Sequence, residues 1–117
     1  MSTTKDEVRS FLKRLEVKIE LYDIIYEDNR PKNAQTLATL ELRPYERDEI
    51  VKNLSVNDYS EGPKPEDYFG GDSEMYVFGK IVKSREIYIK ITLGRKNSSV
   101  ICISFHIAEH PMDYPFK

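Results

Sequence analysis

The chain has 117 residues, of which 39% are hydrophobic and 32% are charged. This composition predicts one soluble globular domain that spans residues 1–117 and buries a single modest core. No apolar run approaches the ~18–20 residues that a membrane span requires, and the N-terminus lacks the apolar core of a signal peptide, so we expect no membrane segment. The lone cysteine, Cys102, has no partner for an internal disulfide and lies in an apolar run. We therefore expect it in the core of a cytoplasmic protein.

The net charge of −2 argues mildly against a general nucleic-acid-binding protein. The charges are unevenly distributed, however, because residues 77–100 contain six basic residues and only one acidic residue. A local basic surface of this kind could hold a phosphate backbone, although ordinary solvated charge explains it equally well.

The N-terminal half of the chain predicts three helices and one strand. In chain order these are a helix over residues 5–16, a strand over about 17–27, a short helix over 33–39 and a helix over about 44–53. Thr4 and Glu7 form a capping box at the start of the first helix. The strand rests on the alternation of apolar residues that begins at Val17. The last helix begins at Pro44, because proline favours the first turn of a helix.

The C-terminal half predicts strands. Residues 55–73 are rich in glycine and proline and predict a loop, which leads to a strand over 74–82. A hairpin follows, with strands over 86–93 and 100–106, and the aromatic residues of the tail after it indicate that the tail packs down. Helices first and strands afterwards predict an α+β fold, in which N-terminal helices pack on a twisted antiparallel sheet of three to four strands.

The hairpin brings polar side chains of chemical interest onto one surface. In the registers that keep its apolar rows together, Tyr88, Lys90, Ser104 and His106 share a face, which by alternation also includes Cys102. Tyr88 and His106 are then direct or diagonal neighbours, roughly 5–8 Å apart at Cβ. A phenol, an ammonium and an imidazole close together can donate protons, accept them and stabilise negative charge. This combination predicts an acid–base site for a phosphate ester.

The same segments resemble a known family. Residues 88–92, a short turn and residues 100–106 are similar to the end of the MqsR-like toxins, the motility quorum-sensing regulator family of bacterial type II toxin–antitoxin systems. Leu54 to Tyr59 also resembles the segment that follows the second helix of that family. The order and spacing of these segments carry the resemblance, and the N-terminal half shares the order of its elements.

The resemblance implies a RelE-like fold and a ribosome-independent, sequence-specific mRNA endonuclease that a cognate antitoxin protein inhibits. Such enzymes use no metal and no other cofactor. The 2′-hydroxyl of the RNA attacks the adjacent phosphorus, which leaves a 2′,3′-cyclic phosphate and a 5′-hydroxyl. The protein supplies a base, an acid and positive charge on the phosphate.

Position by position, the resemblance assigns the active-site tyrosine to Tyr88 and places His106 where a family member has a catalytic lysine. Lys90 joins these two as a catalytic candidate. Further family positions differ here: a lysine aligns near Glu61, and a glutamine aligns near residues 76–77. The remaining candidates for holding RNA or its phosphates are Lys80, Arg85, Arg95 and Tyr76, the last as a platform for a base or, alternatively, as a packed core residue.

Two other readings remain open at this point. A RelE-like binding module could keep partner binding without nuclease activity, and a small-molecule enzyme would require a deep apolar pocket. The tail adds one conditional expectation: if residues 111–116 fold over the hairpin, His110 enters the active surface as a second candidate acid.

Overall fold

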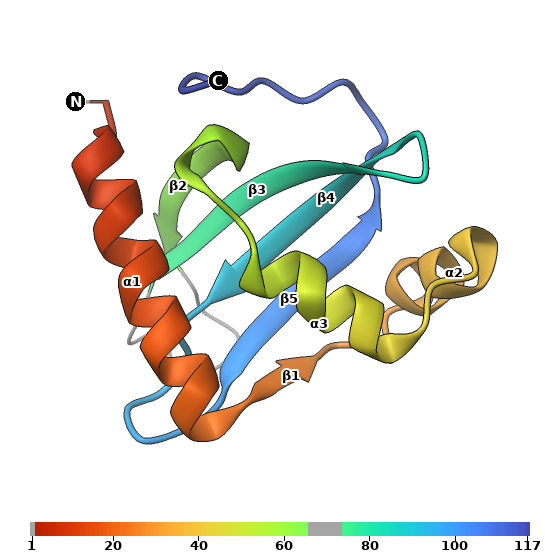
Figure 1. Cartoon of the computed structure of the whole chain (residues 1–117), viewed down its shortest axis with the longest axis horizontal. Coiled ribbons are helices and arrows are strands. Elements are labelled where there is room, and N and C mark those ends of the chain that lie inside the picture. Colours follow the sequence, from red (N-terminus) through yellow and green to blue (C-terminus); the bar gives the residue numbers. More distant parts are fainter. Residues whose placement is uncertain (1, 66–73) are drawn as a thin grey trace.

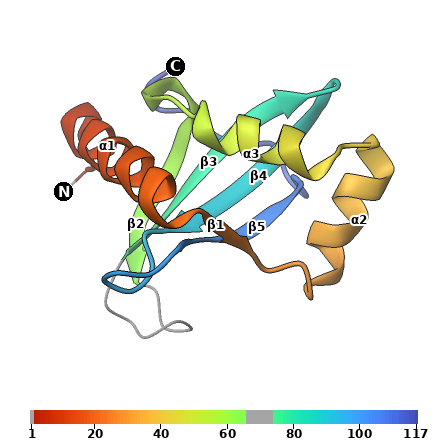
Figure 2. The same ribbon diagram turned by 60° about the horizontal axis from the view of Figure 1, so that its bottom comes forward.

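The computed structural model describes residues 2–65 and 74–117, which form an α+β fold with one mixed sheet. In chain order its elements are α1 (Lys5–Tyr22), β1 (Ile24–Tyr26), α2 (Pro31–Leu40), α3 (Pro44–Lys52), the short 3₁₀ helix η1 (Val56–Asp58), β2 (Tyr59–Pro65), β3 (Glu74–Val82), β4 (Arg85–Thr92) and β5 (Val100–Ile107). Figure 1 shows α1 and α3 lying across one face of the sheet, and Figure 2 shows α2 beside the edge that β1 and β5 form. In the described part of the chain, no helix is long and apolar enough to cross a membrane.

The sheet differs from the expected one in size and in direction. Its described strands number five, in the order β1-β5-β4-β3-β2, and β1 runs parallel to β5 while the other pairs are antiparallel. The additional strand β2 occupies part of the segment expected to be a loop, and residues 66–73 of that prediction lie outside the described residues. The α+β class is confirmed, whereas the purely antiparallel sheet of three to four strands is wrong.

The strand expected over residues 17–27 is mostly helix. Helix α1 continues to Tyr22, and only Ile24–Tyr26 is extended. Leu15 and Ile19 are buried at helical spacing, whereas Val17 is 48% exposed, so the alternation arose from apolar residues on two sides of one helix. The capping box of Thr4 and Glu7 starts α1 as expected.

The core lies between the sheet and the helices α1 and α3. Val8, Phe11 and Leu15 face the sheet at helical spacing. The Phe11 ring lies 4.1 Å, centroid to centroid, from the ring of Tyr76 on β3. On β4, the isoleucines at odd positions fill the same core, so the even positions, including Tyr88, face the opposite side of the sheet.

A β-bulge in β5 changes the alternation on which the sequence prediction relied. Lys90 pairs with Ser104, but the next residue of β4, Ile91, pairs with Cys102, which leaves Ile103 as an extra residue. Cys102 therefore points into the helix-side core, where it is 1% exposed. Its core position is confirmed, but it does not share the face of Ser104, as strict alternation predicted.

Helix α2 completes the outer edge of β5 with polar side chains. The β1 pairing ends at Cys102, and beyond it the buried Asn33 receives a hydrogen bond from the Phe105 backbone N–H (3.0 Å) and donates one to the Ile103 carbonyl (3.0 Å). The Thr36 hydroxyl accepts from the Ile107 N–H (3.2 Å). These side chains replace the missing strand partner, which explains why polar residues of α2 are buried.

The C-terminal tail packs down, as its aromatic residues indicated. Figure 1 shows it running past the ends of β4 and β3 towards β2. The Tyr114 ring lies against Gly79 of β3, and Phe116 stacks on Tyr59 of β2 with ring centroids 5.1 Å apart. The tail is therefore part of the folded domain.

Candidate functional site: an acid–base cleft

A cleft of about 1000 Å³ opens on the sheet face that carries Tyr88. It is bounded by the start of α2, the strands β2, β4 and β5, and the first part of the tail. Its lining residues are Arg30, Pro31, Lys32, Asn33, Ser60, Glu61, Tyr88, Lys90, Ser104, His106, Glu109, His110, Pro111, Met112 and Asp113. The three residues proposed from sequence as catalytic, Tyr88, Lys90 and His106, all line this one cleft.

Tyr88 and His106 form the centre of the site. They are direct partners in the β4–β5 ladder, and their rings stack with centroids 5.2 Å apart and planes inclined by 15°. The Nδ1 atom of His106 lies 2.9 Å from the carbonyl oxygen of Ile107. Because a carbonyl can only accept, Nδ1 donates, and in the neutral imidazole Nε2 then carries the lone pair. The backbone thus selects the tautomer in which Nε2, and not Nδ1, can accept a proton.

The Tyr88 phenol remains protonated at neutral pH. Burial is the main cause that raises its pKa, and the nearby Lys64 ammonium acts in the opposite direction. Tyr88 can therefore donate a hydrogen bond through its hydroxyl while its ring supports the imidazole of His106.

Lys90 supplies positive charge beside this pair. Its Nζ atom lies 5.8 Å from the centroid of the Tyr88 ring, and no ion pair joins it to a carboxylate of the described residues. Burial lowers the pKa of Lys90, and the positive charges of Lys64 and Arg30 lower it further. Arg30 and Lys90 line the cleft, and the Lys64 ammonium is paired with Glu61, another residue of the cleft wall.

Sequence reasoning missed Lys64 and Arg30. Lys64 lies on β2, where it pairs with Met75 and forms an ion pair with Glu61, but its segment was read as a loop. Arg30 precedes α2, in the stretch between the strand and the short helix that the sequence predicted. The sequence offered one signal for Lys64. The resemblance to the MqsR-like toxins aligned a lysine near Glu61, a residue that the structure places on the wall of the cleft.

The tail closes another side of the cleft. Glu109 forms an ion pair of 2.6 Å with Lys32 at the start of α2, and His110 follows it on the cleft wall. Lys32 is the main cause that lowers the pKa of Glu109, and the histidines 106 and 110 contribute in the same direction. His110 was expected to reach the active surface if the tail folded over the hairpin. The structure brings His110 to the cleft that contains His106.

The other four candidates for holding RNA or its phosphates do not line this cleft. Tyr76 is 5% exposed in the core on the opposite face of the sheet. Lys80 lies on that face too, in an ion pair of 3.1 Å with Asp58. Arg85 begins β4 at its turn with β3, and Arg95 lies in the loop at the other end of the hairpin from His106. Strand alternation and the length of the hairpin keep all four off the cleft wall.

Within the described residues, no group of three or more His, Cys, Asp or Glu side chains is placed to hold a metal ion. Comparison of the chain with family models, with curated proteins and with solved structures finds no match in any of the three.

Proposed function

We propose that this protein is a metal-free endoribonuclease that cleaves single-stranded RNA through the 2′-hydroxyl. The observation that carries the proposal is the stacked pair of Tyr88 and His106, with the Nε2 lone pair of His106 available and the ammonium of Lys90 beside it. Imidazole, phenol and ammonium are the groups that this reaction uses when no metal takes part.

The proposed reaction is one in-line displacement at phosphorus. His106 Nε2 removes the proton of the 2′-hydroxyl, and the resulting O2′–P bond forms as the P–O5′ bond breaks. The electron pair of the broken bond goes to O5′, which takes up a proton. The products are a 2′,3′-cyclic phosphate and a 5′-hydroxyl. Lys90 stabilises the negative charge on the phosphoryl oxygens, with Arg30 on the same cleft wall adding to the positive potential.

The resemblance to the MqsR-like toxins supports a narrower statement of the same proposal. In it the chain is a RelE-like mRNA interferase of the bacterial cytoplasm, which acts without the ribosome at a defined sequence and which a cognate antitoxin inhibits. The order of elements, with helices before the antiparallel β4–β5 hairpin that carries Tyr88 and His106, agrees with this reading.

The direct test is cleavage of RNA by the purified protein in the presence of EDTA. We expect fragments that end in a 2′,3′-cyclic phosphate, identified by mass spectrometry. His106→Ala should lose about 100-fold or more in rate, the usual contribution of a general base. Tyr88→Phe should lose less, with Tyr45→Phe as the matched control because Tyr45 is an exposed tyrosine on α3. Full cleavage by a folded His106→Ala variant, or an absolute requirement for magnesium, would refute the proposed mechanism.

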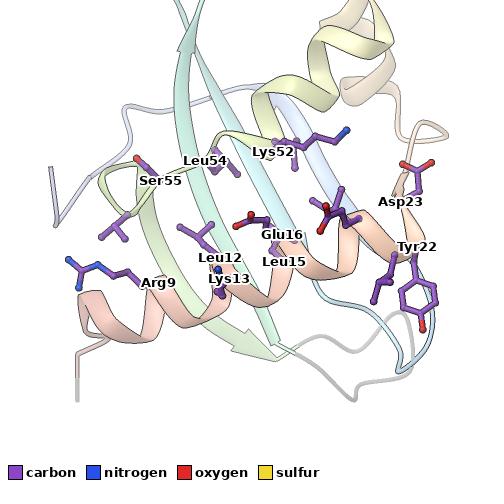
Figure 3. A pocket seen from close by; sticks show the side chains of 15 residues that line it. Arg9, Leu12, Lys13, Leu15, Glu16, Tyr22, Asp23, Lys52, Leu54 and Ser55 are labelled. Carbon is purple, nitrogen blue, oxygen red and sulfur yellow. The ribbon is translucent and has the colours of Figure 1, made fainter.

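A groove on the other face favours a second function, the binding of a protein partner. It has a volume of about 1080 Å³, and Leu12, Leu15 and Leu54 contribute its apolar floor between α1 and the segment after α3. Figure 3 shows Arg9 at one end of this groove and Asp23 at the other. Beside the acidic end, Leu21 is 69% exposed.

These features fit an amphipathic helix of a partner protein, with acidic residues near Arg9 and basic residues near Asp23. The resemblance names a cognate antitoxin for this role. Co-expression with the product of the neighbouring gene should give a complex that Leu21→Glu weakens. Ile81→Glu, which changes another exposed apolar residue at the end of β3, should leave the complex intact. A complex formed by a protein that cuts no RNA would favour the non-catalytic binding module.

A further inference from the structure

One residue, Glu86, holds both ends of the first part of the tail through its backbone and its side chain. Its backbone carbonyl accepts a hydrogen bond from the Ala108 N–H (2.8 Å). Its carboxylate accepts from the Met112 N–H at Oε1 (3.2 Å) and from the Tyr114 hydroxyl at Oε2 (2.7 Å). Residues 108–114 thus form a loop that begins and ends on a single residue of β4. We call this segment the Glu86 loop.

Two further contacts fix the Glu86 loop on the sheet. The ion pair between Glu109 and Lys32 ties the loop to the start of α2, and the Tyr114 ring lies against Gly79 on β3. Burial, followed by the hydrogen bond to Glu86, raises the pKa of the Tyr114 phenol. The phenol is therefore protonated at neutral pH and keeps its hydrogen bond to the carboxylate.

His110 lies in the middle of the Glu86 loop and lines the cleft that contains His106. His106, Glu109 and His110 all line this one cleft. His106 comes from the sheet and has its Nδ1 bound to the backbone, whereas the Glu86 loop delivers His110 from the side of the tail.

The reaction proposed above lacks an acid, and the other groups of the cleft are less suited to this task. The Tyr88 phenol is a weak acid whose pKa burial raises. Lys90 acts best as a lasting positive charge on the phosphoryl oxygens. An imidazole ordinarily titrates near neutral pH, which allows it to give up a proton during the reaction.

We propose that His110 is the general acid of the site and that Glu86 is the residue that positions it. The inference rests on the ribonuclease function proposed above. His110 gives its proton to O5′ as the P–O5′ bond breaks, while His106 retains the proton taken from the 2′-hydroxyl. Proton exchange with water then restores both imidazoles.

Two versions of one oligoribonucleotide test this assignment. The first has the natural 5′-oxygen at the cleaved bond, and the second has sulfur in its place, because a thiolate leaves without taking up a proton. His110→Ala should cut the natural oligonucleotide about 100-fold more slowly or worse, and it should cut the sulfur version at close to the wild-type rate. His106→Ala should lose activity on both.

Glu86→Gln should show the same pattern as His110→Ala to a smaller extent, because a carboxamide keeps the shape of the side chain but loses the charge that holds Tyr114. Glu41→Gln, a change of an exposed residue at the end of α2, should leave both rates unchanged. This pattern distinguishes positioning of an acid from general damage to the fold, which would lower both rates.

The outcomes separate the two proposals. A wild-type protein that cuts neither oligonucleotide refutes the ribonuclease function itself. If the wild type is active but His110→Ala is unimpaired, or is slowed equally on both oligonucleotides, the role of His110 as the acid is refuted. The ribonuclease function then still stands. If thermal unfolding shows that the His110→Ala variant is not folded, His110→Gln takes its place in the same comparison, because glutamine retains a similar size and polarity.

Discussion

The Tyr114 ring of the tail lies directly on Gly79 of β3, so close that a Cβ atom at residue 79 would lie within 2.8 Å of the ring carbon Cε1. Gly79 is also the strand neighbour of Tyr88. A small residue in β3 thereby lets the tail approach the centre of the candidate site. The contact links the packing of the tail to the geometry of the cleft.

We predict that Gly79→Ala displaces Tyr114 and destabilises the fold by about 1–3 kcal/mol, the usual cost of overpacking. The urea unfolding midpoint measures the loss. The double variant Gly79→Ala with Tyr114→Ala is the control, because it removes the ring that the new methyl group meets. If the contact causes the loss, the double variant will lose less than the sum of the two single changes. Simple additivity would contradict this explanation.

Asn33 should contribute more to stability than its place on a helix suggests. Its amide bonds three backbone groups, the Glu27 carbonyl among them. Asn33→Leu keeps a similar volume but leaves these groups without a partner, and we expect a loss of about 2–4 kcal/mol in the free energy of unfolding. Gln35→Leu changes an exposed residue of the same helix and should cost little. Equal losses for the two variants would contradict the proposed role of α2 as a substitute strand.

The pair of Asp28 and Arg47 should make stability depend on pH in the acid range. The buried guanidinium of Arg47 holds both carboxylate oxygens of Asp28, at 2.7 and 2.9 Å, and this hydrogen bonding is the main cause that lowers the pKa of Asp28. Since the folded pKa lies below the unfolded one, near 3.9, the contribution is complete above about pH 4. It declines as the pH falls through the lower folded value.

Asp28→Asn should therefore cost about 2 kcal/mol at pH 7, a figure that allows for partial solvent screening of Asp28. Below pH 4 the difference from wild type should shrink. Urea unfolding at pH 7 and pH 3 measures both values, with Asp6→Asn on the exposed side of α1 as the control. A difference that stays constant between the two pH values would show that ionisation of Asp28 does not contribute.

Lys90 should limit cleavage at alkaline pH. Burial is the main cause that lowers its pKa, with Lys64 and Arg30 acting in the same direction. The ammonium is then lost at a lower pH than the ordinary lysine value, near 10.4, and the rate should fall with it. Lys90→Arg should extend activity to higher pH, because a guanidinium stays charged. The rate between pH 7 and pH 10, measured on the oligonucleotide with sulfur at the 5′-position because its cleavage needs no acid, checks this prediction. Identical alkaline profiles for wild type and Lys90→Arg would exclude Lys90 as the group that titrates.

The sequence alone predicted the centre of the candidate site. Turn residues between two alternating strands indicated the hairpin, and keeping the apolar rows together limited its register. Tyr88 and His106 were therefore expected as direct or diagonal neighbours, and the structure makes them direct partners. The start of α1 was equally local, because Thr4 and Glu7 satisfy the backbone of the first turn by themselves.

Tertiary contacts decided the rest. The bulge at Ile103 turned Cys102 into the core, and burial of Ile19 against the sheet kept residues 17–22 helical despite their alternation. Strand β2 forms because β3 provides hydrogen-bonding partners for its backbone, and this pairing places Lys64 opposite Met75.

Several parts of the cleft come from segments that are far apart in the chain. Arg30, Glu61 and His110 arrive from the start of α2, from β2 and from the tail, and no local pattern links them. A sequence displays the interactions between neighbouring residues, such as caps, turns and alternation. Which distant segments meet depends on the burial of apolar area and on the pairing of backbone groups across the whole fold, and these were determined only in the tertiary structure.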